Sequence, residues 1–141
     1  MTTTGYLLDI HAVLVRRLRA YTPLTDVVGQ RIYARHYPER VTLPACRVVV
    51  PAHTGAAIPS PAWWYYTGQV DCHGNKHEEA FQVAQLVQSG LLSLESSDDP
   101  DAVFAAVDPF GVQTGFDGEW TPPKPRWIVA VTLTARTRQE E

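Results

Sequence analysis

The sequence contains little cysteine, no excess of positive charge and no long apolar run, and each of these shortages excludes a class of protein. Two cysteines, Cys46 and Cys72, cannot build a disulfide framework. Twelve Lys and Arg residues against fifteen Asp and Glu give a net charge of -3, which argues against a nucleic-acid binder. No apolar run approaches the ~20 residues that span a bilayer, and the N-terminus lacks the segments of a signal peptide.

The length and the apolar content are sufficient for one globular domain. The chain has 141 residues, of which 45% are hydrophobic, and a core of this size needs neither metals nor disulfides. We expect a single domain over residues 1–141, soluble and made in the cytoplasm, with no membrane partner. Both cysteines fall in strand-like runs, where a small buried thiol is common, so we expect them to be buried and reduced.

The best candidate for a metal site is Asp71-Cys72-His73 with His77 four residues beyond. Thiolate, imidazole and carboxylate groups are all zinc ligands. However, neighbouring residues of a strand point to opposite faces, so Cys72 and His73 cannot face the same ion. His77 lies across a turn, in the first turn of a predicted helix. We therefore predict no metal site.

Sequence signals for catalysis are equally weak. Either cysteine could pair with a histidine, but neither lies at a helix N-terminus or among positive charges that would lower the pKa of a thiol. Ser89 and Gly90 fall inside a predicted helix, not on a strand-to-helix turn, and residues 111–115 lack the lysine of a phosphate-binding loop. We predict no catalytic residue and no cofactor. A small thiol or zinc enzyme remains the rival hypothesis from a different class.

Hydrophobic periodicity predicts two main helices and several strands. Helical spacing covers residues 5–21, where a threonine run offers the N-cap, and residues 76–94, where Asn75 and Glu78 form a start like a capping box. Period-two alternation predicts strands at residues 45–50, 62–73, 102–107 and 126–137. The second helix has an inward apolar stripe of Ala80, Val83, Ala84, Val87, Leu91 and Leu94. The predicted fold class is α+β, a mostly antiparallel sheet of about four to five strands with two main helices packed on one face.

Two segments rich in proline and glycine predict extended loops, near residues 51–62 and 108–125. The first carries no charge and has Ile58 near its tip. The second holds four prolines and three glycines, with Phe116 and Trp120 among them. Because a long irregular segment in a small domain is often an interface arm, Ile58, Phe116 and Trp120 are candidate interface residues.

The strand at residues 62–73 begins with four consecutive aromatics, Trp63, Trp64, Tyr65 and Tyr66. Period-two geometry sends one pair of them to each face of the sheet. The helices of this chain can cover one face, which leaves the other pair to find a partner. We therefore predict a component of an assembly and take all four aromatics as candidate interface residues. The pattern leaves open which pair faces the core.

Taken in order, the elements and three short runs resemble a known family. The runs are residues 23–33, PLTDVVGQRIY, residues 43–50, LPACRVVV, and residues 68–72, GQVDC. A helix ending in arginines precedes them, and a helix and an arginine-led last strand follow. Over about residues 7–136 the chain resembles the tail-terminator, or tail-completion, proteins of long-tailed (siphovirus-type) bacteriophages.

The resemblance implies a hexameric ring that caps the tail tube, ends its polymerisation and joins the tail to the head-side connector. It implies a structural protein of the virion tail and neck and no enzymatic activity. The implied partners are further copies of the chain, the tail tube protein and the head-completion or stopper protein, with DNA only as cargo passing through the lumen. Another neck protein, such as a head-closure stopper or an adaptor, is the nearest alternative, because each is a small ring-forming domain.

Overall fold

The computed structural model describes residues 8–55, 63–96, 99–120 and 122–138. The helices are α1 (Ile10–Arg19), α2 (Thr22–Val28) and α3 (His77–Leu92), and α3 continues into a short 3-10 helix, η1 (Ser93–Ser96). The strands are β1 (Ile32–Ala34), β2 (Ala45–Gly55), β3 (Trp64–His73), β4 (Ala102–Asp117) and β5 (Lys124–Thr137). They form a five-stranded sheet in the order β1-β2-β3-β5-β4. Strands β1 and β2 run parallel and the other neighbours antiparallel, which confirms the predicted fold class.

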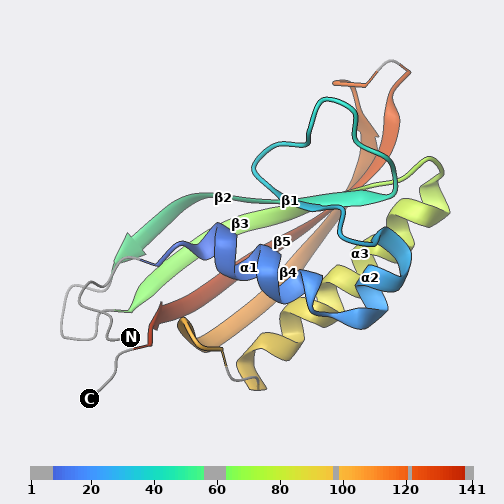
Figure 1. Cartoon of the computed structure of the whole chain (residues 1–141). Helices are drawn as coiled ribbons and strands as arrows, with labels where there is room; N and C mark the ends of the chain where they lie inside the picture. Colours follow the sequence, from blue (N-terminus) through green and yellow to red (C-terminus); the bar gives the residue numbers. More distant parts are fainter. Residues whose placement is uncertain (1–7, 56–62, 97–98, 121, 139–141) are drawn as a thin grey trace.

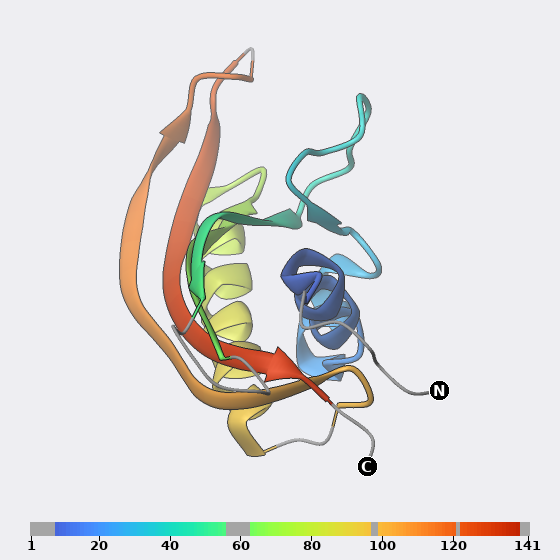
Figure 2. The same cartoon turned by 90° about the vertical axis from the view of Figure 1, so that its left-hand side faces the viewer.

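The sheet is strongly curved, and the helices lie against its concave face (Figure 1 and Figure 2). Helix α3 packs on β3, β4 and β5, while α1 packs on β1 and β2. The core between the two layers is apolar, and Leu14, Leu18, Leu91 and Val70 are fully buried in it. Burying a side chain of this kind contributes about 1.5–3 kcal/mol. The concave face of the sheet is therefore covered by helices of the same subunit. None of the described helices covers the convex face.

Helix α1 begins later than its apolar spacing predicts, at Ile10 instead of residue 5. The N-cap is Asp9, whose carboxylate accepts a hydrogen bond from the Ala12 N–H at 3.1 Å, and not a residue of the threonine run. A carboxylate is a strong cap because it accepts an unpaired N–H of the first turn and favours the positive end of the helix dipole. The threonine cap was therefore a wrong prediction.

Helix α3 confirms the predicted inward stripe, since all six residues named for it are buried on the sheet or beside η1. Its start differs in detail from the prediction. The N-cap residue is Lys76, which makes no side-chain cap bond. The Asn75 N–H instead donates to the carboxylate of Glu79 at 2.8 Å. The helix begins one residue later than the predicted capping box requires, so Glu79 takes the role expected of Glu78.

The expected loop near residues 51–62 is in part a strand. Strand β2 continues through Pro51 to Gly55 after a shift in its pairing with β3 between Val49 and Ala52. Gly68 lies opposite this shift, and a Cβ on it would come within 2.6 Å of the Val49 carbonyl oxygen. The two strands can approach this closely because Gly68 has no side chain. Residues 56–62 lie outside the described residues.

The second expected loop, residues 108–125, was a wrong prediction. Most of it forms the end of β4, a turn, and the start of β5, in a hairpin whose tip projects beyond the body (Figure 1). Pairing is continuous from Gly111 opposite Ala130 to Asp117 opposite Lys124. Pro109 falls in the bulge between Asp108 and Gly111, on an outer strand, where its missing N–H breaks no ladder bond. Proline and glycine here mark an edge strand.

Candidate functional site

The four consecutive aromatics at the start of β3, Trp63 just before it and the other three within it, divide between the faces as period-two geometry requires. Tyr66 is only 4% exposed and belongs to the core, and Trp64 packs against that core from the same face. The prediction of Trp64 and Tyr66 as interface residues is therefore corrected. The helices of the same subunit already cover the face of the sheet to which these two side chains point. Tyr65 is 51% exposed, and the half-buried Trp63 lies under the guanidinium of Arg136 at 5.1 Å. The pair left for a partner is Trp63 and Tyr65.

The remaining interface candidates lie at the hairpin or outside the described residues. Phe116 is 70% exposed near the end of β4. Trp120 is half-buried in the turn, and its ring centroid lies 6.2 Å from that of Tyr37 and 5.9 Å from that of His73. Phe116 is thus available to a partner, whereas Trp120 packs mainly within its own subunit. Ile58 belongs to the segment that is not described.

Three exposed apolar side chains escaped the sequence analysis: Phe110, Leu92 and Phe81 are 61%, 56% and 39% exposed. Phe81 and Leu92 lie out of phase with the inward stripe of α3. Their helical positions could therefore have shown from the sequence that these two side chains point away from the core. Phe110 was hidden by the prediction of a loop. The carbonyl of Pro109 accepts a hydrogen bond from the Gln88 amide, so the edge strand and α3 adjoin. Phe110 and Phe116 thus lie on the edge strand, and Phe81 and Leu92 on the helix that adjoins it.

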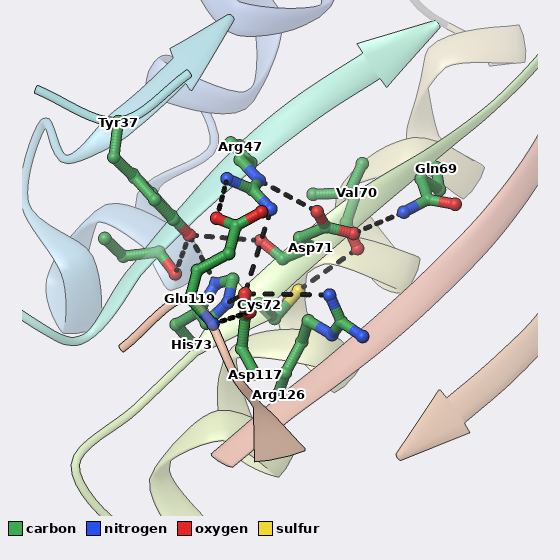
Figure 3. A network of polar contacts seen from close by, with 11 residues as sticks. Tyr37, Arg47, Gln69, Val70, Asp71, Cys72, His73, Asp117, Glu119 and Arg126 are labelled. Atoms are coloured by element: carbon green, nitrogen blue, oxygen red, sulfur yellow. Dashed lines mark hydrogen bonds and ion pairs between the residues drawn. The ribbon is translucent and has the colours of Figure 1, made fainter. Parts of the chain in front are cut away.

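The base of the hairpin is held by a buried histidine, His73 at the end of β3 (Figure 3). Its Nε2 lies 2.8 Å from a carboxylate oxygen of Asp117, and its Nδ1 lies 2.8 Å from the Tyr37 hydroxyl. Because a carboxylate only accepts, Nε2 carries the proton in a neutral ring and Nδ1 accepts from Tyr37. Burial lowers the pKa of His73, and the hydrogen bond to Asp117 offsets part of this effect. His73 thereby joins β3, the hairpin and the segment after β1.

An arginine completes this network from β2. The Nε of Arg47 donates to Asp71 at 2.8 Å, and its terminal nitrogens lie 3.8 Å from Asp117 and 3.6 Å from Glu119. Arg126 adds a further cation 3.6 Å from Asp117. Burial alone would raise the pKa of Asp117, but the Glu119 N–H, His73 and Arg126 hold it below its usual range. The network sets two arginines against three carboxylates and joins four separate segments of the chain.

The stability of the protein should fall on acidification, beginning near pH 6.5. Burial lowers the pKa of both His11 and His73 below the ordinary value of 6.5. The unfolded chain then binds protons before the folded chain does, so stability is complete above about pH 6.5 and is lost below it. Each histidine contributes a slope of at most about 1.4 kcal/mol per pH unit. Urea unfolding at pH 7.5, 6.5 and 5.5 measures this.

A variant of His11 provides the control for this pH dependence. His11 Nε2 accepts the Val50 N–H at 3.0 Å, and the side-chain oxygen of glutamine can accept the same bond without titrating. His11→Gln should therefore flatten the acid slope. An unfolding midpoint that does not change between pH 7.5 and 5.5 in the parent protein would contradict the prediction.

The residues considered for metal binding are not gathered into one site. Cys72 is buried on the core side of β3, His73 is engaged with Asp117 on the other side, and His77 contacts the Trp127 ring at 5.4 Å. Within the described ranges, no group of three or more His, Cys, Asp or Glu residues could hold a metal ion. Nor does any helix in those ranges have the length and apolar character that crossing a membrane requires.

Both thiols should stay unmodified by a thiol reagent in the native protein and react only on unfolding. Cys46 and Cys72 are free and fully buried. Burial raises the pKa of Cys46 to about 12 and that of Cys72 well above its ordinary value, so the reactive thiolate is scarce at neutral pH. Ellman's reagent with and without guanidinium measures this. A thiol that reacts rapidly in the native protein would revive the thiol-enzyme hypothesis.

Fold and surface together define a small α+β domain with a projecting hairpin and an exposed apolar edge, features typical of a protein that contacts other chains. No protein-family model and no curated protein matches the sequence. Among solved structures, a chain from the "virion of native gene transfer agent (GTA) particle" has a similar fold, with a TM-score of 0.66 and 15% sequence identity. The match covers 94% of this chain and 95% of that one.

Proposed function

We propose that this chain is a structural protein of a phage-like virion. The observation that carries the proposal is the fold match to a chain of a gene transfer agent virion, which covers nearly the whole of both chains. An almost complete match means that the two folds correspond as whole domains. The exposed edge and the hairpin arm supply the surfaces that a subunit of a particle needs.

Within the virion, the role supported best is that of a tail terminator. Such a protein forms a hexameric ring that caps the tail tube, ends its polymerisation and joins the tail to the head-side connector. The sequence resemblance over about residues 7–136 favours this role. A ring also requires two different lateral surfaces on each subunit, and this sheet has two unlike edges: β1 is three residues long and β4 sixteen.

The proposed role involves no catalysis. His73, Asp71 and Asp117 of the hairpin network are buried, and each is engaged by another group of the network. Both thiols are enclosed in the core. Buried groups that are engaged with one another in this way suit a structural joint better than a substrate site.

Electron microscopy of particles assembled without this protein tests the proposal. Overlong or unattached tails, restored to normal by supplying the protein, are the expected result. Heads that lose their DNA while tails have normal length would instead indicate a head-closure stopper. Normal particles would overturn the structural role altogether. Light scattering of the purified protein, alone and with the tail tube protein, measures ring formation independently.

A further inference from the structure

The two edges of the sheet differ in charge as well as in length. Strand β4 pairs with β5 alone. Its other side is met by Glu95 at Val107 and by Gln88 at Pro109, and beyond these two contacts it is an open edge. From residue 99 to residue 117 the sequence contains four aspartates and no lysine or arginine, and three of these aspartates are already paired with arginines elsewhere in the subunit. Asp108 is exposed beside the bulge, and no described residue forms an ion pair with it. The "β4 edge", residues 108–117, is thus acidic at its start and carries the exposed rings of Phe110 and Phe116.

Edge strands of this length are usually protected against pairing with other chains. Protection comes from charged side chains, prolines, bulges or a covering element. The β4 edge has its bulge and proline at one end only, and residues 110–116 hold no charge and pair with β5 in regular register from Gly111 onward. An open, uncharged and regular edge of this kind is suited to contact with another chain.

The segment that follows β1, at the other edge of the sheet, is basic. The segment after β1 contains Arg35 and Arg40, both exposed, with Glu39 as the one acid over residues 31–41. No described residue forms an ion pair with Arg40. The charge of Arg40 is therefore complementary to that of Asp108, the one acid of the β4 edge that is exposed and without an ion pair among the described residues.

A pocket lies next to Arg40. It has a volume of about 280 Å³, and its walls are Tyr37, Pro38, Val41 and Trp120, with Glu39, Glu119, His36 and Arg47 as the polar lining. A cavity of about 150 Å³ already accommodates benzene, so this pocket is large enough for a phenylalanine ring. Its aromatic walls suit such a ring.

We propose that the β4 edge of one copy docks on the segment after β1 of the next copy. Phe110 enters the pocket and packs against the outer sides of Tyr37 and Trp120, whose rings already contact each other, and Asp108, two residues away on the same strand, faces Arg40. The contact joins two different surfaces, so repeating it generates a closed ring or a filament. The inference rests on the proposed function and assigns the surfaces of its ring.

Cross-linking of the full chain tests this assignment. Asp108→Cys and Arg40→Cys are made singly and together, and each protein is treated at high concentration with a short bis-maleimide. The native thiols are buried, so the parent protein should not react. The double variant should give a ladder of covalent oligomers, and neither single variant should. Phe110→Ser in the double variant should weaken the ladder at least tenfold, because a buried aromatic anchor dominates contacts of this kind.

A matched control moves one thiol off the proposed surface. Gln82→Cys, on an exposed position of α3, replaces Asp108→Cys in the double variant and should give no ladder. Covalent dimers of the Asp108→Cys single variant would show β4 edges pairing with each other and overturn the proposal. Absence of a ladder in the double variant would overturn it too. If native mass spectrometry still shows a hexamer in that case, the ring is retained and only its assigned surfaces fail.

Discussion

Replacing Trp64 and Tyr66 together with serine should unfold most of the protein, whereas the same replacement of Trp63 and Tyr65 should leave the fold intact. Tyr66 is buried and Trp64 packs against the core under the helices. Truncating one large core aromatic costs about 3–5 kcal/mol, and two such losses approach the total stability of about 5–15 kcal/mol that is usual for a domain. On the other face, Tyr65 is half exposed and Trp63 rests against Arg136, so the expected loss is about 1 kcal/mol.

Urea unfolding and the mass of the assembled species separate the two double variants. The Trp64 and Tyr66 variant should show no cooperative transition, and the Trp63 and Tyr65 variant should unfold near the parent midpoint. Under the proposed function, the second variant should also assemble poorly while staying folded, because it removes the apolar residues of the uncovered face. Two variants that fold and assemble equally well would contradict the division of the aromatics between core and contact.

Replacing Arg47 with methionine should lower the free energy of unfolding by about 3–5 kcal/mol. Arg47 donates to Asp71, a side chain that is 3% exposed, at 2.8 Å. Methionine fills much of the same space but leaves that carboxylate buried without its cation. The remaining partner of the carboxylate is the Gln69 amide at 2.6 Å, and a neutral donor does not offset the cost of a buried charge.

A second substitution that removes the charge of Asp71 provides the control for Arg47→Met. The double variant Arg47→Met, Asp71→Asn keeps an acceptor for Gln69 and eliminates the uncompensated carboxylate, so it should be more stable than Arg47→Met alone. Urea unfolding at neutral pH measures all three proteins. If the double variant is no more stable than Arg47→Met, the loss comes from packing against Tyr37, over whose ring the guanidinium lies at 5.2 Å, and the electrostatic explanation fails.

Local patterns in the sequence were sufficient for the elements that pack on one another within the subunit. The inward stripe of α3 and the alternation of β5 follow from spacing alone, because burial of one helix face or one strand face selects apolar residues at fixed intervals. Burial of both thiols followed in the same way from their positions in apolar strands. The start of α1 did not follow from the sequence pattern, because the carboxylate of Asp9 is the N-cap and not one of the threonines before it.

The edge strand was the main failure of sequence reasoning. Pro109, Gly111 and Gly115 are usual signals of a loop, and they predict one unless the strand is known to lie at the border of a sheet. That border position depends on the strand order, in which β5 inserts between β3 and β4. No property of residues 108–117 by themselves specifies that order.

The sequence by itself determined the fold class, the two main helices, most of the strands and the existence of one aromatic pair on each face of β3. Only the tertiary structure decided that Trp64 and Tyr66 face the core, that β4 is an open edge, and that His73 meets Asp117 across 44 positions of the chain. The physical reason is that periodicity encodes which residues share a face. Which face is covered, and which distant side chains meet, depends on strand order, register and the curvature of the whole sheet.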